Sequence, residues 1–247
     1  MPTYQEVNNK KSNVSCVILH FDATPVVAFE LYELGALMSD IKSPDRNLAM
    51  ELVRVTEAAA MAAARWMGRG DKEGADDAAV NAMRFVLRSV SMDGIVIIGE
   101  GEKDEAPMLY NGEQVGNGSS PKCDVAVDPI DGTTLTSLGR GNAIAVLAVS
   151  EEGTMFDPGP CVYMEKIAVG SGLPSGLIDL DNSVEKNIKL LADARNKKIN
   201  QITACILKRP RHDKIISILN SLNVKINFIQ DGDVTGVISV VDKNSPI

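Results

Sequence analysis

The sequence predicts a mixed α/β fold in which helices and strands form layers. Short apolar runs that suit buried strands alternate with segments whose apolar residues recur every three or four positions, as on one face of a helix. The links between these segments are short, which is typical of layered α/β domains. The chain has 247 residues, 45% of them hydrophobic and 23% charged, so it can bury the core of one large domain or two small ones.

Composition divides the chain into three segments. Residues 1–43 are mixed in character and contain one candidate strand, Val14–Phe21. Residues 44–170 carry the strongest helix and strand patterns, and glycines and prolines at 170–176 mark the boundary with residues 171–247. We therefore expect two α/β halves after a divergent N-terminal segment.

Two amphipathic helices open the first half. Ser43 followed by Pro44 has the form of a helix cap with proline at the first helical position. Gly68–Lys72 separates the two helices. The apolar face of the first helix comprises Leu48, Leu52, Val55, Ala59, Ala62 and Trp66, and that of the second comprises Val80, Met83, Leu87 and Val90.

The remaining elements alternate between strand and helix. In the first half we expect strands at Ile95–Gly99, Val125–Val127, Ala143–Val149 and Tyr163–Val169. In the second half we expect helices at Ser183–Ala194 and Arg211–Leu222, strands at Ile202–Leu207 and Val224–Ile229, and a last helix after Asp233.

The segment Asp124–Thr134 joins a strand to a turn that carries two carboxylates. Strand side chains alternate faces and rise about 3.3 Å per residue, so Asp124 and Asp128 share a face at roughly 13 Å and, in a straight strand, cannot hold one ion. Pro129 should end the strand ladder, which lets Asp131 fold back beside Asp128. Carboxylates at this spacing suit Mg²⁺ or another hard divalent cation together with a phosphate.

The residues after Asp131 favour an anion. Gly132 lets the backbone approach a ligand closely, and Thr133 and Thr134 suit a helix start, where free N–H groups attract a phosphate. The combination indicates metal-dependent hydrolysis of a phosphate ester. The alternative is an ordinary β-turn rich in aspartate and glycine.

Other acidic residues are ambiguous when each is taken alone. Asp76, near the start of the second helix, is better explained as a helix cap than as a metal ligand. Glu100 follows an apolar strand, where open α/β sheets place their sites, so a functional and a structural role are equally good explanations. Glu102, Asp104 and Glu105 are better explained as a solvated run of charges.

Two loops of the second half suit a sugar phosphate. Lys208–His212 places cations at the start of a helix, which suits a phosphate clamp and equally a basic surface turn. Asp231–Asp233 follows a strand and could accept hydrogen bonds from sugar hydroxyls, or cap the last helix. Tyr163 on its own is best explained as part of the core.

Charge and composition argue against several classes of protein. A net charge of −8 and 4% aromatic residues do not suit a nucleic-acid surface. No apolar run approaches the length of a membrane span, and the N-terminus lacks the order of a secretory signal. The cysteines have no paired spacing, so we expect reduced thiols in a cytoplasmic compartment. They are Cys16, Cys123, Cys161 and Cys205.

A series of motifs in fixed order points to one family. The motifs are Glu57, Arg65–Lys72, Glu100–Glu102, Asp104–Tyr110, Asp128–Thr133, Tyr163–Lys166, Pro210–Asp213 and Asp231–Val234. Over roughly residues 47–237, the chain resembles class II fructose-1,6-bisphosphatase, the bacterial and algal type. Some members also hydrolyse sedoheptulose-1,7-bisphosphate. The family belongs to the lithium-sensitive sugar and inositol phosphatases, whose layers are ordered αβαβα.

The resemblance implies a catalytic site with two divalent cations, Mg²⁺ or Mn²⁺. It assigns Asp76 and Glu100 to one cation, and Asp128 and Asp131 to the other. Position 131 is often glutamate in the family, whereas aspartate matches the wider group of phosphatases. The implied catalytic residues are Asp128, Asp131, Thr133 and Lys72, and the implied substrate-binding residues are Asp131, Gly132, Thr133, Tyr163, Arg209, Pro210, Arg211, Asp231, Gly232 and Asp233.

The sequence departs from the family pattern at both ends. Family members continue past residue 247 with a Gly-Gly-Ala-Pro-Glu-Gly segment whose glutamate completes the second metal site, and residues 1–43 do not match. On this basis we expect a truncated or alternatively spliced chain. Its second half, 171–247, would be a partial sugar-phosphate-binding half, and 44–170 would be the metal-binding half.

We therefore expect hydrolysis of the 1-phosphate of fructose-1,6-bisphosphate, or of sedoheptulose-1,7-bisphosphate, in gluconeogenesis or the Calvin cycle. The resemblance also implies a homo-oligomer, a dimer or tetramer, in the cytoplasm, or in a plastid if the source is an alga or plant. Two alternatives stay open. The chain could be an inactive homologue that binds sugar phosphates, or a phosphatase for another ester such as inositol monophosphate.

Overall fold

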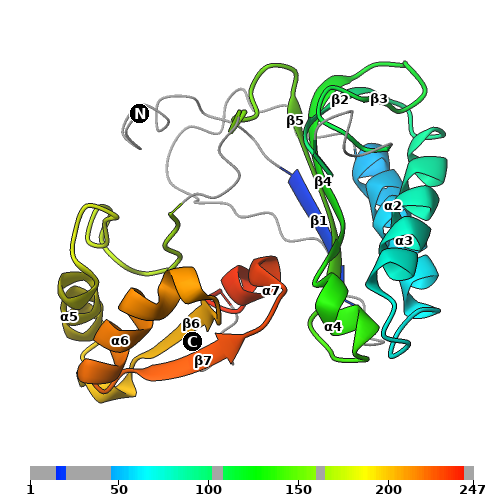
Figure 1. Ribbon diagram of the computed structural model, residues 1–247. Coiled ribbons are helices and arrows are strands. Elements are labelled where there is room, and N and C mark those ends of the chain that lie inside the picture. Colours follow the sequence, from blue (N-terminus) through cyan, green and yellow to red (C-terminus); the bar gives the residue numbers. More distant parts are fainter. Residues whose placement is uncertain (1–14, 21–45, 102–107, 160–164, 242–247) are drawn as a thin grey trace. The chain divides into compact units, whose positions relative to one another are not determined.

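The computed structural model describes residues 15–20, 46–101, 108–159 and 165–241. The chain forms two compact units, Met1–Pro160 and Cys161–Ile247. Each unit has its own sheet (Figure 1). Each also has its own core of buried apolar side chains. None of the helices in the described ranges is both long enough and apolar enough to cross a bilayer.

The first unit is built on a five-stranded mixed sheet with the strand order β1-β5-β4-β2-β3. β2 and β4 are parallel neighbours, and the other neighbouring pairs are antiparallel. The strands are β1 (Ser15–His20), β2 (Asp93–Ile98), β3 (Gln114–Val115), β4 (Lys122–Asp131) and β5 (Ile144–Glu151). These positions confirm the strands that the apolar runs predict near residues 14–21, 95–99, 125–127 and 143–149.

Helices α2 (Arg46–Ala64) and α3 (Lys72–Leu87) lie on one face of this sheet (Figure 1). Both predicted helices are confirmed, although Trp66 and Val90 lie just beyond the helix ends. The apolar stripe of each helix is its buried face, as the spacing requires. Its most deeply buried side chains include Leu52, Val55, Met83 and Leu87, each at most 1% exposed.

The turn between α2 and α3 is bonded to the short helix α4 (Thr133–Ser137). The Gly68 N–H donates to the Thr136 carbonyl at 3.0 Å. The Gly70 N–H donates to the Ser137 carbonyl at 2.8 Å. α3 therefore begins beside the strand end that carries the predicted phosphate-ester site.

The course of β4 corrects the prediction of a turn at Pro129. The strand continues through Pro129 to Asp131, and its pairing with β5 shifts register between Asp128 and Asp131. Pro129 lies in this irregular stretch, where the ladder does not require its missing N–H.

Two further differences concern strands. Residues 165–169, the described part of the predicted strand Tyr163–Val169, form no strand, and β3 was not predicted. The predicted helix cap at Ser43 and Pro44 lies outside the described residues.

The second unit has a two-stranded parallel sheet, β6 (Thr203–Leu207) and β7 (Lys225–Ile229). Its core is small and includes Ala192, Ile202, Leu219 and Val224. The helices are α5 (Val184–Ala194), α6 (Asp213–Ser221) and α7 (Asp233–Ile238), with 3₁₀ turns at Ile199–Gln201 and Pro210–His212. The alternation of helix and strand predicted for residues 183–229 is confirmed.

Candidate active site

The ends of two parallel neighbouring strands form the centre of the candidate site. Glu100 lies just past β2 and Asp131 ends β4, so both lie at the same edge of the sheet. Asp128 precedes Asp131 in the irregular part of β4, and its Oδ1 accepts a hydrogen bond from the Ile130 N–H at 3.0 Å. Three of the predicted metal ligands therefore lie at one edge.

Gly132 turns the chain from β4 into α4 with a φ of 103°. This left-handed conformation favours glycine, and a Cβ would lie 3.2 Å from Ala143 Cα and from Leu135 Cδ1. In the next residue, the Thr133 hydroxyl donates to the Ile130 carbonyl at 3.2 Å. The predicted phosphate-contacting segment is thus a compact strand-to-helix turn.

Helix α3 carries the fourth predicted ligand, Asp76. The cap of this helix is Asp71, whose Oδ1 accepts a hydrogen bond from the Gly74 N–H at 2.9 Å. Asp76 lies about one turn further along and is half-buried, so capping does not account for it. Lys72 is the first residue of α3 and is exposed.

Glu100 is held by a loop that folds back over the end of β2. The Glu100 N–H donates to the Leu109 carbonyl at 2.9 Å. Gly99 permits this contact, because a Cβ at Gly99 would lie 2.0 Å from the Leu109 carbonyl oxygen. The Gly99 N–H also donates to Asn111 Oδ1 at 2.9 Å.

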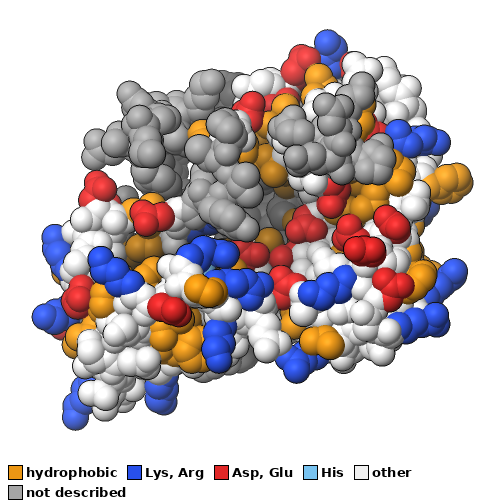
Figure 2. Space-filling view, viewed as in Figure 1, with side chains coloured by type: hydrophobic (Ala, Val, Ile, Leu, Met, Phe, Trp, Pro, Cys, Tyr) orange, Lys and Arg blue, Asp and Glu red, His pale blue; other side chains and the backbone are white. Residues whose placement is uncertain are grey.

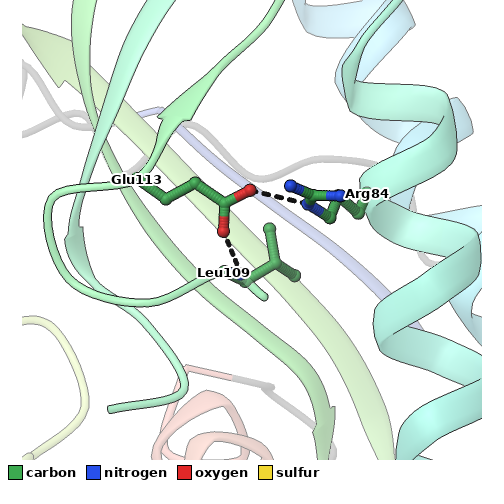
Figure 3. A network of polar contacts seen from close by, with 3 residues as sticks. All are labelled: Arg84, Leu109 and Glu113. Atoms are coloured by element: carbon green, nitrogen blue, oxygen red, sulfur yellow. Dashed lines mark hydrogen bonds and ion pairs between the residues drawn. The ribbon is translucent and has the colours of Figure 1, made fainter. Parts of the chain in front are cut away.

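The buried Glu113 carboxylate fixes this loop to α3. Its Oε1 accepts a hydrogen bond from Arg84 Nε at 2.6 Å, and its Oε2 accepts one from the Leu109 N–H (Figure 3). The network therefore ties the helix that carries Asp76 to the loop that holds Glu100. Sequence reasoning missed Glu113 and Arg84, which are 29 residues apart and show no local spacing that indicates a pair.

Partial burial and mutual repulsion raise the pKa values of the site carboxyl groups. Burial raises the pKa of Asp128 to about 8, with further contributions from the Asp131 and Glu100 charges and a smaller one from Asp76. Burial and the Asp76 charge raise the pKa of Glu100 to about 7. Burial and the Asp77 charge raise the pKa of Asp76. The charges of the four predicted ligands are thus electrostatically coupled.

The same region forms an acidic surface on the first unit. Asp and Glu side chains gather over α3 and the end of β4 (Figure 2). However, no group of three or more His, Cys, Asp or Glu side chains within the described ranges is arranged to hold a metal ion. The site has oxygen donors and negative charge for hard cations, and the assignment of each ligand stays a prediction.

Asp124, at the start of the same motif, has a structural role. Its side chain is buried, and its Oδ2 accepts hydrogen bonds from the Thr154 and Met155 N–H groups, both at 2.9 Å. These bonds attach the segment after β5 to β4. The Asp124 carboxylate thus stabilises the connection between these two segments.

In the second unit, the two predicted substrate loops lie at one edge of the small sheet. Leu207 pairs with Ile229 at the carboxyl ends of the parallel strands. Lys208–His212 and Asp231–Asp233 follow these two ends directly, so the basic turn and the acidic turn are neighbours. This is the edge at which open α/β sheets bind ligands.

The two loops present different groups. Arg209 is half-buried and donates from Nη1 to the Lys208 carbonyl at 3.2 Å, whereas Arg211 is exposed in the 3₁₀ turn that Pro210 begins. Gly232 is buried with a φ of 76° and leads into α7. Of the remaining predicted substrate residues, Asp231 is half-buried, Asp233 is exposed and Tyr163 lies outside the described residues.

Comparison with known proteins identifies the family. A family model described as bacterial fructose-1,6-bisphosphatase, glpX-encoded, matches residues 46–247. The chain is 50% identical to fructose-1,6-bisphosphatase class 2 of Haemophilus influenzae over 192 residues, which cover 78% of this chain and 57% of that protein. It is also 50% identical to fructose-1,6-bisphosphatase 1 class 2 of Escherichia coli over 193 residues, with the same coverage of 78% and 57%. The chain thus spans little more than half the length of these relatives. On this similarity the chain belongs to the family of glpX-encoded bacterial fructose-1,6-bisphosphatases.

Proposed function

We propose that the chain hydrolyses the 1-phosphate of fructose-1,6-bisphosphate, with sedoheptulose-1,7-bisphosphate as a second substrate. The observation that carries the proposal is the raised pKa of Asp128, which reflects burial beside three other carboxyl groups. Such a cluster is costly when ionised unless cations compensate its charge. Strongly perturbed carboxyl groups at a sheet edge are typical of functional sites.

The donor set fits two hard divalent cations, Mg²⁺ or Mn²⁺. Asp76 and Glu100 are the proposed ligands of one cation, and Asp128 and Asp131 those of the other. Bound at these carboxylates, the cations supply an activated water and positive charge for the phosphate. The carboxyl groups must converge to bind them, because the described residues form no closed cage.

The other residues of the first unit bind and orient the substrate in this proposal. The Gly132 and Thr133 N–H groups donate to the phosphate oxygens, where negative charge develops. The Thr133 hydroxyl exchanges its bond to the Ile130 carbonyl for one to the attacking water. Lys72 balances the charge of the phosphate from the start of α3.

The carboxyl edge of β6 and β7 supplies the proposed contacts to the rest of the sugar bisphosphate. Arg209 and Arg211, in the turn that Pro210 begins, suit a second phosphate group. Asp231 and Asp233 accept hydrogen bonds from sugar hydroxyls around Gly232, and Tyr163 is assigned to the same task by its family motif.

Phosphate release from fructose-1,6-bisphosphate, measured with and without Mg²⁺ or Mn²⁺, tests the proposal. We expect cation-dependent release by the wild-type chain and loss of release in Asp128→Asn and Asp76→Asn. Asp77→Asn is the matched control, because Asp77 is the exposed neighbour of Asp76 and is not a proposed ligand. Undiminished turnover in Asp128→Asn would refute the assignment.

One observation favours a second candidate, a protein that binds sugar phosphates without turnover. Hydrolysis requires carboxyl groups arranged around a metal ion, and the described residues form no such group of three or more. Calorimetry with fructose-1,6-bisphosphate, run beside the release assay, separates the two functions. Binding heat without phosphate release supports this candidate, and release from inositol monophosphate alone would instead support a phosphatase for another ester.

We extend the proposal to properties that family membership suggests. The fold would be the αβαβα sandwich of the lithium-sensitive phosphatases, of which the mixed α/β units are a part. The protein would act as a homo-oligomer, a dimer or tetramer, in the cytoplasm.

A further inference from the structure

The exposed face of α2 has an unusual composition. Met50 and Met61 are 63% and 68% exposed, and between them Arg54 and Glu57 are also exposed. The steps of four, three and four residues place all four side chains on one stripe of the helix. The opposite face of α2 is the buried one, so this stripe points away from the sheet and from the core.

The stripe is symmetric about its midpoint, with a methionine at each end and two opposite charges at the inner positions. Met50 and Met61 are equally distant from the midpoint between Val55 and Thr56, and so are Arg54 and Glu57. In two identical antiparallel helices related by a two-fold axis at that midpoint, Met50 faces Met61 of the second copy and Arg54 faces Glu57 of the second copy. Both ion pairs and both apolar contacts therefore form at once.

The two charges have no competing partner in the chain. Within the described ranges, neither Arg54 nor Glu57 makes a side-chain hydrogen bond or ion pair. A second copy related by this axis places an opposite charge against each of the two residues. Met and Arg are also enriched at protein–protein interfaces.

We propose that α2 pairs with α2 of a second copy of this chain, antiparallel about a two-fold axis, through Met50, Arg54, Glu57 and Met61. The pairing does not depend on the proposed catalytic function. It defines an isologous seam of about 16 Å between Met50 and Met61, from the rise of an α-helix. Because four side chains are less than a standard interface, neighbouring surface of each copy must add to the contact.

Charge reversal tests the seam in the full chain by sedimentation equilibrium. We expect the wild type to dimerise. Arg54→Glu should raise the dimer Kd at least about tenfold, because it places a glutamate opposite Glu57 of the second copy on both sides of the axis. Glu57→Arg should do the same, and the double variant R54E/E57R should restore the wild-type Kd. Arg88→Glu, an exposed reversal at the end of α3, is the control and should leave the Kd unchanged.

Disulfide capture tests the antiparallel register separately. A mixture of Met50→Cys and Met61→Cys chains should form a crosslinked dimer under oxidation. Met50→Cys alone should not, because its two copies lie about 16 Å apart, beyond disulfide reach. A monomeric wild type, a failure of the double variant to restore dimerisation, or equal crosslinking of Met50→Cys with itself would overturn the proposal. Circular dichroism melting of each variant separates loss of pairing from loss of folding.

Discussion

At the scale of single residues, the ionisation of Asp128 links the site to stability. Its folded pKa is about 8, well above the usual value for aspartate, so ionisation opposes folding. The protonated Asp128 carboxyl contributes stability that is fully present below its pKa in the unfolded chain, near 4. This stability is lost as the pH rises through its pKa in the folded chain. Without cations, the folded chain should therefore lose stability between about pH 4 and pH 8.

Asp128→Asn should remove this loss. In the presence of EDTA, we expect the variant to be more stable than the wild type by about 1–3 kcal/mol at pH 8.5, and by much less at pH 5. Urea unfolding at the two pH values measures the difference. An equal gain for Asp128→Asn at both pH values would contradict ionisation of Asp128 as the cause.

The buried Glu113 carboxylate makes a second prediction at this scale. Glu113→Ala leaves Arg84 Nε and the Leu109 N–H without their acceptor, so we expect a loss of about 2–4 kcal/mol in unfolding free energy. Glu113→Gln keeps an acceptor and should lose less. If the network also positions Glu100, both variants should bind Mn²⁺ more weakly in calorimetry, and Glu113→Ala should lose more affinity than Glu113→Gln. Equal stability of all three chains would contradict the role of the network.

At the scale of elements, local patterns predicted most of the fold. Helix spacing located α2 and α3, and apolar runs located β2, β4 and β5, because each pattern reflects burial of one face or of a whole strand. Pro129 was misread because the register shift opposite β5 has no local signal. The two-residue strand β3 depends on pairing with β2, a tertiary contact that no short pattern encodes.

The loop over β2 allows a prediction about Gly99. A Cβ at Gly99 would lie 2.0 Å from the Leu109 carbonyl oxygen, so Gly99→Ala must displace the loop that holds Glu100. We expect a loss of about 2–4 kcal/mol in unfolding free energy together with weaker cation binding. Gly153→Ala is the control, because Gly153 has a φ of 74° and open space around it, and should cost only about 1–2 kcal/mol through backbone strain. Similar costs for the two variants would argue against the close approach.

At the scale of the whole molecule, the chain distributes its predicted functional residues over two compact units. The first unit carries the carboxyl groups, and the second carries the basic turn and the Asp231–Asp233 loop. The sequence predicted both groups, because acids and cations stand next to apolar strands in each half. It could not identify how the carboxyl groups are supported, since Arg84, Glu113 and Asn111 act through contacts between distant segments.

The small parallel sheet of the second unit provides a matched pair of sites for the last prediction. Arg209 and Arg211 follow the carboxyl end of β6, whereas Lys225 begins β7 at the opposite edge and is exposed. If the carboxyl edge binds a phosphate group, R209A/R211A should weaken fructose-1,6-bisphosphate binding at least about tenfold, as loss of charge-assisted contacts implies. Lys225→Ala removes one exposed positive charge of the same unit and should leave the affinity unchanged. Calorimetry measures the affinity of the wild type and of each variant for fructose-1,6-bisphosphate and for fructose 6-phosphate. Equal losses for the two variants would indicate a general effect of charge instead of a site at the carboxyl edge.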